Sequence, residues 1–311
     1  MSNTPLVSVC IPAYNCENYI VDTIKCLLGQ TYTNLEIVVV NDGSTDETLI
    51  KLKTIAQSRL KLIDTVNGGA AKARNLAYHH SKGEYIIFFD ADDLVDNNYI
   101  ESQLNVLKSD SQSIVVAQWG RFYKEDKSDF ELIKNPNHSM TLDTWVEEFW
   151  YHVNPMTNPG RFLIPRNIIE SAGLWNENLS LNDDLEFFTR VFSNSKLIIF
   201  NDYSTFYYRS GINGLSGKKG TKANTSLFKS VKLSTEIVLN KYKNAATQKA
   251  CANMWQSLIY ILYNNDNNLV NLAEKEISRL VKSDLKYPSG GFTNLSIKLL
   301  GWKLTAKLKS N

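Results

Sequence analysis

Three aspartates lie close together in the segment Asp90-Ala-Asp-Asp93, directly after the apolar run Tyr85–Phe89. Carboxylates at positions i, i+2 and i+3 of a turn can converge on one hard cation, and their oxygen atoms suit Mg²⁺ or Mn²⁺. Such a cation keeps open positions for phosphate groups and stabilises a diphosphate as a leaving group. The alternative is a solvated acidic turn that caps a helix beginning near Asp96.

Two further segments contain residue types that suit a nucleotide. In Asn41-Asp-Gly-Ser-Thr-Asp46, Asp42 can accept hydrogen bonds from a base or a ribose. In Asn67-Gly-Gly-Ala-Ala-Lys-Ala-Arg-Asn75, the glycines let backbone N–H groups approach an anion, and Arg74 adds positive charge. Taken alone, each segment is also compatible with an ordinary turn at the start of a helix.

Short apolar runs separated by helical patterns position these segments. The runs Leu6–Pro12, Leu35–Val40, Leu60–Ile63 and Tyr85–Phe89 lack polar alternation, which is typical of strands buried on both faces. Strands that alternate with helices predict a parallel sheet with right-handed crossovers. Because ligands bind beyond the carboxyl ends of such strands, we expect the four loops that follow the runs to meet at one rim.

The remaining chain divides into a mixed part and a helical part. Within residues 111–220 the hydrophobic pattern predicts strands near 114–119, 197–200 and 205–208, with helices near 142–151 and 185–192. Beyond residue 220 the periodicity predicts helices alone. We therefore expect a catalytic domain over residues 1–220 and a helical C-terminal extension over residues 221–311.

The segment 285–311 contains five lysines and no acidic residue. Leu295, Leu299 and Trp302 share a helical face, next to Leu300 and Leu304. This pattern is typical of a helix on an anionic membrane surface, with the tryptophan at the interface. A terminal helix that packs on the core and turns its lysines outward is the alternative.

Composition and charge exclude several classes of protein. A net charge of +2 does not predict a nucleic-acid partner. The N-terminal residues lack the features of a signal peptide, and no window approaches ~18 uninterrupted apolar residues. Four cysteines without a CxxC pair favour reduced thiols. We expect a cytoplasmic location, with peripheral attachment to the inner face of the cell membrane if the C-terminal segment binds lipid.

Four segments, in this order, resemble the inverting glycosyltransferases of family 2, which have the GT-A fold. They are VSVCIPAYN, EIVVVNDGSTDET, NGGAAKARNLA and GEYIIFFDADD. The resemblance implies an α/β, Rossmann-like, mostly parallel sheet flanked by helices, with a nucleotide-sugar-binding half at 1–110 and an acceptor half at 111–220. The nucleotide-sugar site that it implies contains Pro12, Tyr14, Asp42, Asn67, Arg74, Asp90, Ala91, Asp92 and Arg209.

The resemblance also implies roles within this site. Pro12 and Tyr14 line the nucleoside pocket, and Asp42 meets the base. Arg74 lies beside the nucleotide. Asp90 and Asp92 are the metal-binding pair, with Asp92 the closest ligand of Mn²⁺ or Mg²⁺.

The segment Asn182-Asp-Asp-Leu-Glu186 resembles the acidic segment that supplies the general base of this family. By position Asp184 is that base, and Asp183 stands where glutamate is usual. The alternative is structural, since acids in a first turn favour the helix dipole. Many relatives have a histidine just after the arginine that corresponds to Arg209, whereas here Ser210 follows it. Arg209 is expected to contact phosphate or to lie exposed at a strand end.

The function implied is the transfer of a sugar, with inversion, from a nucleotide diphosphate to an acceptor hydroxyl. A uridine-diphosphate sugar is the expected donor, and a bacterial-type polysaccharide or lipid-linked glycan is the expected acceptor. One alternative, a sugar-nucleotide pyrophosphorylase, needs a glycine-rich loop where Pro12-Ala-Tyr-Asn follows the first strand. The other is a catalytically inactive relative that binds nucleotide sugars and acts as a partner-binding module.

Overall fold

The chain forms two compact units, which we describe separately. A computed structural model describes residues 4–55, 57–155, 157–212, 214, 217, 219–289 and 292–309, apart from the side chains of 292–295, 298 and 309. The sheet unit comprises Met1–Leu142 and Thr157–Leu215, and the helical unit comprises Asp143–Met156 and Ser216–Asn311. The sequence predicts a single boundary at residue 220. The structure groups the short segment Asp143–Met156 with the helices beyond that boundary.

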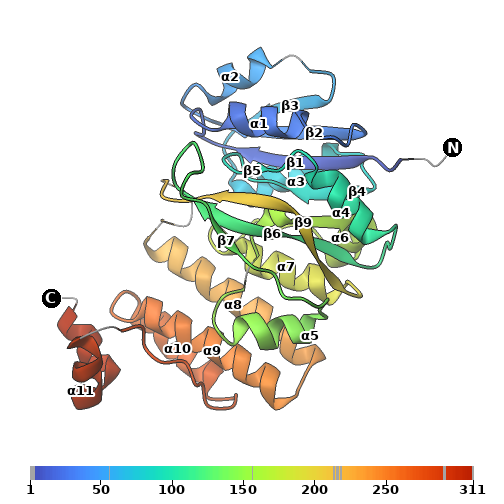
Figure 1. The fold of residues 1–311 in the computed structure, drawn as a ribbon. Helices are drawn as coiled ribbons and strands as arrows, with labels where there is room; N and C mark the ends of the chain where they lie inside the picture. Colours follow the sequence, from blue (N-terminus) through green and yellow to red (C-terminus); the bar gives the residue numbers. More distant parts are fainter. Residues whose placement is uncertain are drawn as a thin grey trace. The chain divides into compact units, whose positions relative to one another are not determined.

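The first half of the sheet unit is a parallel α/β arrangement (Figure 1). Strand β1 (Val7–Ala13) lies between β2 (Leu35–Asp42) and β4 (Tyr85–Phe88), and all three are parallel. The next strand, β3 (Leu60–Thr65), pairs in parallel with β2. The helices between these strands are α1 (Ile20–Leu28), α2 (Thr48–Thr54) and α3 (Ala70–His80). The parallel sheet that the apolar runs predict is confirmed.

The second half of the sheet is mixed. Continuing from β4, the order is β8 (Phe162–Pro165), β6 (Ile114–Phe122), β9 (Ile198–Arg209) and β5 (Leu94–Val95), and β7 (Glu131–Ile133) pairs with β6. Strand β8 is antiparallel to both of its neighbours, whereas β6 and β9 are parallel. The sequence predicts two strands, at 197–200 and 205–208. The structure has one strand with an irregularity, where Ala117 faces Asn201 and Gln118 faces Thr205.

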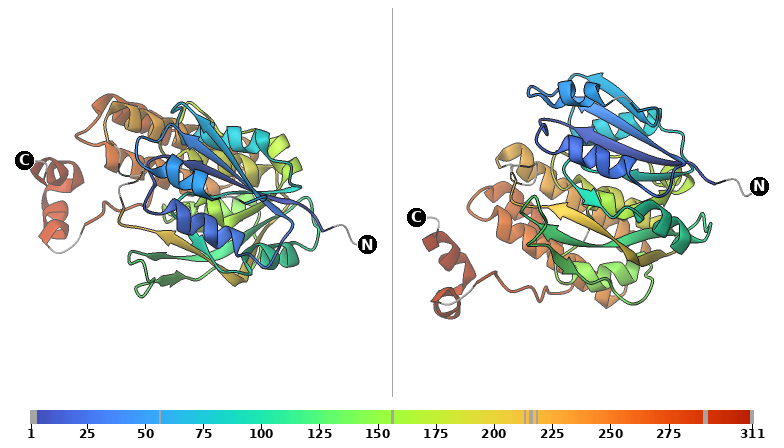
Figure 2. Two further views of the ribbon diagram at one scale, coloured as in Figure 1. Left: turned by 90° about the horizontal axis from the view of Figure 1, so that it is seen from above. Right: turned by 45° about the horizontal axis from the view of Figure 1, so that its top comes forward.

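Helices lie on both faces of this sheet, as Figure 2 shows. Those of the second half are α4 (Tyr99–Leu107), α6 (Arg166–Ala172) and α7 (Asp183–Ser193), with a short 3₁₀ turn at Pro159–Arg161. Aromatic rings pack α7 against β4: Phe88 and Phe187 meet edge to face at 5.4 Å, and Trp175 stacks on Phe187 at 4.1 Å. Such pairs contribute about 0.5–1.5 kcal/mol each beyond their buried area. This packing holds the start of α7 near the end of β4.

In the described part of the helical unit we find four helices and a short irregular one. They are α8 (Thr221–Lys241), α9 (Ala245–Leu262), α10 (Asn267–Ile277) and α11 (Phe292–Lys309), with α5 (Leu142–Trp145) running into a π-helix at Val146–Trp150. Asn244 and Asp266 cap α9 and α10 by accepting backbone N–H groups of the first turn. Among the described residues, no helix has both the length and the apolar character that crossing a bilayer requires.

The last helix, α11, is broken at Gly301, whose φ of 76° and ψ of 161° are not helical. The ring of Trp302 packs against Tyr260 and Tyr263, with centroids 4.8 and 4.9 Å apart, and stacks on Tyr287. The sequence places Trp302 at a membrane interface on one face with Leu295 and Leu299. The break at Gly301 interrupts that continuous face, and the ring of Trp302 packs against aromatic side chains of the same unit. Contact of this segment with a membrane stays a prediction.

Candidate active site

The acidic turn Asp90–Asp93 follows β4 and is held from two sides. Thr23 of α1 places its hydroxyl oxygen 3.0 Å from the carbonyl oxygens of Ala91 and Asp93. The Asp93 carboxylate accepts the backbone N–H of Arg209, the last residue of β9, at 2.8 Å. Asp93 is 1% exposed, and its hydrogen bond with Arg209 links β9 to the turn. Asp90 and Asp92 are more accessible than Asp93, and they are the side chains left for a ligand.

The two carboxylates predicted to bind metal form an electrostatically strained pair. Burial raises the pKa of Asp92 to about 7, and the negative charge of Asp90 adds to the rise. Burial, with the charges of its two neighbours, likewise holds the pKa of Asp93 well above its ordinary range. A divalent cation between Asp90 and Asp92 would relieve this repulsion.

This donor set fits Mg²⁺ or Mn²⁺. Both side chains offer hard carboxylate oxygens, which these ions prefer. Among the described residues, no group of three or more His, Cys, Asp or Glu side chains is arranged to hold a metal ion. Asp90 and Asp92 would therefore leave most of the coordination sphere to phosphate oxygens and water, as the sequence predicts for a metal that carries a diphosphate.

Arg74 of α3 connects the acidic turn to the start of α7. Its guanidinium donates to Asp90 at 2.8 Å and to Asp183 at 2.9 Å. Arg74 is 6% exposed, and its Cζ atom lies 4.4 Å from the centroid of the Trp175 ring. Burial works against the charged form, but the two carboxylates prevail and raise the pKa of Arg74. Two of the motifs singled out in the sequence are thus joined by one charged side chain.

Asp184, the predicted base, has surroundings unlike those of Asp183. The hydroxyl of Thr157 donates to its Oδ2 atom at 2.9 Å. Burial raises the pKa of Asp184 to about 6, and the charge of Asp183 contributes. Asn182, just before the helix, adopts the left-handed conformation (φ 59°, ψ 28°) and turns the chain into α7. A carboxylate with a pKa near 6 is ionised at neutral pH, yet it accepts a proton more readily than an ordinary aspartate does.

Asp42, at the end of β2, organises the neighbouring glycine loop. Its two carboxylate oxygens accept the N–H groups of Gly68 and Gly69 at 2.7 and 2.9 Å. Asn67 donates from its side chain to the carbonyl oxygen of Asp42 at 2.8 Å. The chain leaves β2 through Gly43, whose φ is +67° and where a Cβ atom would lie 2.6 Å from the N atom of Asn67. The predicted contact of Asp42 with a base stays a prediction.

The other predicted nucleotide-binding residues lie at the ends of the same parallel strands. Pro12 is the next-to-last residue of β1 and is partly buried, and Tyr14 just beyond the strand is 48% exposed. Asn67 is exposed in the loop before α3. Parallel strands bring their carboxyl ends to one edge, so these side chains share a rim with the acidic turn. Their nucleotide contacts remain predictions.

Arg209 differs from the exposed strand-end arginine that was one of the two expectations. It is 4% exposed, and its Nε atom donates to the carbonyl oxygen of Asp92 at 2.8 Å. Its Nη1 atom pairs with Glu125 at 2.8 Å. Its Cζ atom lies 4.7 Å from the ring centroids of both Tyr19 and Phe122. The arginine thus supports the acidic turn, and the predicted phosphate contact remains a prediction.

Four residues beside this site were not singled out by the sequence. Thr23 supports the acidic turn, Thr157 donates to Asp184, Trp175 lies under Arg74, and Glu125 pairs with Arg209. None belongs to a motif, and each reaches the site from a distant part of the chain. For Thr157 and Glu125 we find no sequence signal that would have revealed them.

The fold is that of the GT-A class. The solved structure of TarS from S. aureus in complex with UDP-GlcNAc has this fold: it matches with a TM-score of 0.70 and 17% identity, over 88% of this chain and 80% of that one. A family model described as glycosyl transferase family 2 matches residues 8–171, more than half of the chain. The protein belongs to that family.

Curated relatives agree with this assignment. The chain is 32% identical over 197 residues to an uncharacterized glycosyltransferase of Rickettsia prowazekii, covering 62% of this chain and 61% of that protein. It is 27% identical over 226 residues to the minor teichoic acid biosynthesis protein GgaB of Bacillus subtilis, covering 71% of this chain and 25% of GgaB. The chain thus spans about three fifths of the length of the first of these relatives and a quarter of the second.

Proposed function

We propose that this protein transfers a sugar from a nucleoside-diphosphate donor to an acceptor hydroxyl by a single displacement with inversion. The observation that carries the proposal is the meeting of three motifs at one rim: Asp90 and Asp92, Arg74, and the pair Asp183–Asp184. A binding module needs no buried carboxylate with a raised pKa beside its donor site. Asp184 has this property, which suits proton transfer.

In this mechanism Asp184 accepts the proton of the acceptor hydroxyl as its oxygen attacks the anomeric carbon. Thr157 orients the carboxylate of Asp184 by donating to one of its oxygens. Asp90 and Asp92 would hold Mg²⁺ or Mn²⁺, which when bound neutralises the charge of the departing diphosphate. Arg74 holds Asp90 in place. Inversion follows from a single displacement, so an α-linked donor gives a β-linkage.

We further propose a uridine-diphosphate sugar as the donor and a cell-envelope glycan or lipid-linked glycan as the acceptor. TarS is solved with UDP-GlcNAc, and GgaB is named for teichoic acid biosynthesis, which makes UDP-GlcNAc the first donor to test. The test is release of UDP from UDP-GlcNAc and other uridine-diphosphate sugars, with Mn²⁺ and with EDTA. Metal-dependent release supports the proposal, and binding without any release supports the inactive-relative alternative.

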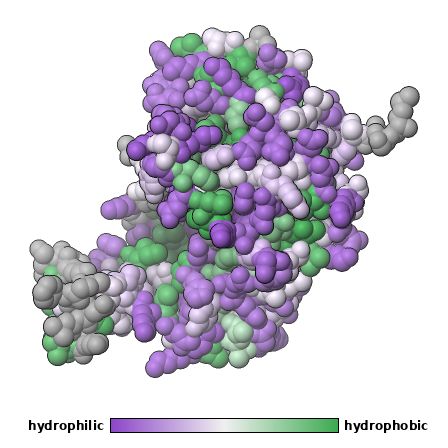
Figure 3. Space-filling view, viewed as in Figure 1, coloured by the Kyte–Doolittle hydropathy of each residue, from purple (hydrophilic) through white to green (hydrophobic). Residues whose placement is uncertain are grey.

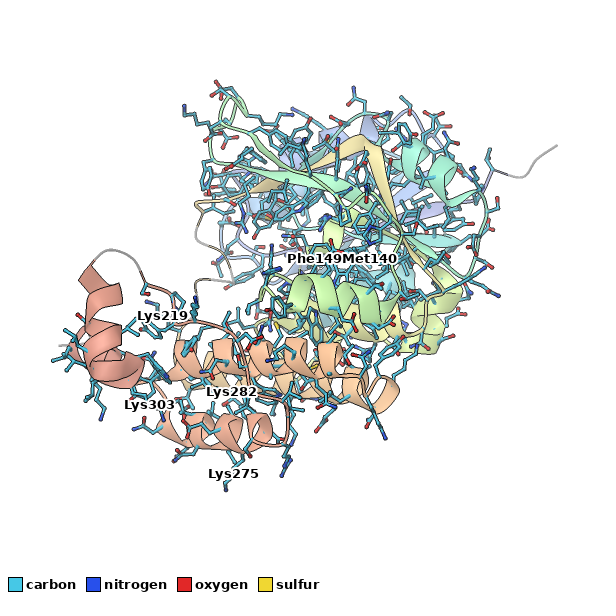
Figure 4. All side chains as sticks on the ribbon, turned by 60° about the horizontal axis from the view of Figure 1, so that its bottom comes forward. Met140, Phe149, Lys219, Lys275, Lys282 and Lys303 are labelled. Atoms are coloured by element: carbon cyan, nitrogen blue, oxygen red, sulfur yellow. The ribbon has the colours of Figure 1, made fainter. Side chains whose placement is uncertain are left out.

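Peripheral attachment to an anionic membrane is the second part of the proposal, and the charge distribution supports it. Over the whole sequence the helical unit has 16 Lys and Arg against 8 Asp and Glu, whereas the sheet unit has 18 against 24. The net charge of +2 therefore conceals about +8 on the helical unit and −6 on the sheet unit. Figure 4 shows Lys275, Lys282 and Lys303 on α10, on the segment that follows it, and on α11.

Exposed leucines supply the apolar component of the proposed membrane-binding surface. Leu299, Leu300, Leu304 and Leu308 of α11 are 75%, 47%, 54% and 66% exposed, and Figure 3 shows green, hydrophobic atoms at this end of the chain. Trp302 packs against aromatic side chains of its own unit, and Thr305 and Ala306 are buried. Leucines beside lysines are typical of a helix that enters the lipid headgroup region, where each basic residue contributes about 1 kcal/mol.

A further inference from the structure

Asp183 draws attention because nothing in the proposed chemistry needs it. It is adjacent to the base, yet neighbouring side chains on a helix diverge by about 100°, so the two carboxylates cannot both face the acceptor. Its Oδ2 atom instead accepts from Nη1 of Arg74 at 2.9 Å. The side chain is 16% exposed, so this ion pair is shielded from water.

The partner of Asp183 is also the partner of a predicted metal ligand. Nη2 of Arg74 donates to Oδ1 of Asp90 at 2.8 Å. A carboxylate oxygen that accepts from a guanidinium has less electron density to offer a cation, so Arg74 and a metal ion compete for Asp90. Trp175 packs against the guanidinium and limits how far Arg74 can move. How strongly Asp183 holds the guanidinium, compared with Asp90, therefore decides how much of Asp90 is left for a metal ion.

We propose that Asp183 is a positioning residue that sets metal affinity through Arg74. By holding one side of the guanidinium, Asp183 prevents Arg74 from turning fully onto Asp90, and Asp90 keeps an oxygen for the metal. The inference rests on the proposed metal-dependent function. It adds a coupling between the helix that provides the base and the turn that binds the metal, which the motifs do not reveal when taken singly.

The test measures Mn²⁺ binding directly, by electron paramagnetic resonance of free Mn²⁺ in the presence of UDP. Asp183→Asn should raise the Kd for Mn²⁺ by about threefold to tenfold, a range expected when one contact of a coupled ion-pair network is removed. Asp184→Asn is the matched control, because it removes the same charge one residue away without touching Arg74. It should change the Kd less than about twofold. Asp183→Glu should restore most of the affinity.

A double-mutant cycle separates the effect through Arg74 from a general effect of charge. In an Arg74→Met background, the substitution Asp183→Asn should no longer alter Mn²⁺ affinity. Arg74→Lys serves the same purpose if Arg74→Met does not fold, since an ammonium cannot bridge both carboxylates as the planar guanidinium does.

Two failures are distinguishable. If the unaltered protein binds no Mn²⁺ in the presence of UDP, the metal-dependent function and this inference both fall. If it binds Mn²⁺ and Asp183→Asn binds equally well, or if the loss is the same with and without Arg74, only the role of Asp183 is overturned.

Discussion

Replacing Asp184 by asparagine separates the catalytic role of this residue from a structural one. The substitution keeps the shape of the side chain and an oxygen that can accept from Thr157. A positioned general base contributes about 10²–10⁴-fold, so we expect turnover to fall by that factor. Binding of UDP and Mn²⁺ should change little, because the base acts on the acceptor.

The raised pKa of Asp184 predicts opposite effects on activity and on stability. Its rise from the ordinary 3.8 to about 6 means that the folded protein holds this proton more tightly than the unfolded chain does. The ionised carboxylate therefore lowers the free energy of unfolding. This penalty is absent below about pH 4, grows between pH 4 and 6, and reaches about 3 kcal/mol above pH 6. Asp184→Asn should remove it at pH 8 and leave stability at pH 4 unchanged.

The assay combines pH–rate profiles with urea unfolding at pH 4 and pH 8. In the unaltered enzyme, turnover should rise about tenfold per pH unit up to an apparent pKa near 6 and then level off. This limb should be missing from the residual activity of Asp184→Asn. A variant that retains more than a tenth of the turnover, or that loses stability equally at both pH values, would show that Asp184 supports the helix instead of the reaction. If Asp183→Asn were the inactive variant, the base would be assigned one residue too late.

Three further predictions concern the metal, the tail and a turn. EDTA should abolish turnover reversibly, and Asp92→Asn should behave like metal removal with an unchanged fold by circular dichroism; full turnover in EDTA would refute the metal role. The double substitution Leu304→Gln/Leu308→Gln should weaken binding to anionic vesicles at least about tenfold with little change in melting temperature. The control Leu132→Gln replaces an exposed leucine of the sheet unit and should leave vesicle binding unchanged. Equal vesicle binding by the unaltered protein and both variants would show that the leucines of α11 do not contact lipid. Gly43→Ala should destabilise the protein by more than about 1 kcal/mol in urea unfolding, because its φ is +67° and a Cβ atom would lie 2.6 Å from the N atom of Asn67; an unchanged midpoint would mean that this turn relaxes freely.

The parallel half of the sheet was predictable because its strands are buried on both faces. Continuous apolar runs such as Leu35–Val40 have few other interpretations, and polar loops must follow them at the same edge. The short strands β5 and β7 have no comparable pattern. Their pairing depends on distant partners: the two residues of β5 pair with β9, more than a hundred positions later.

Candidate site residues could be chosen from the sequence where motifs are local, whereas the long-range contacts between them could not. Asp90, Asp92 and Asp184 could be chosen from segments a few residues long. The bridge by Arg74 joins residues 16 and 109 positions away, and no spacing rule connects them. Trp302 illustrates the opposite error, because a helical pattern assumed to be continuous is broken by a glycine with a positive φ.

The most direct test of the central claim follows the anomeric carbon of the donor. A panel of α-linked uridine-diphosphate sugars is incubated with the protein and Mn²⁺, and the newly released or transferred sugar is observed by proton NMR before its anomers equilibrate. A metal-dependent single displacement with Asp184 as the base predicts that the β-anomer forms first, that EDTA stops its formation, and that Asp184→Asn slows it at least a hundredfold. First appearance of the α-anomer, or the same rate in Asp184→Asn, would contradict the account.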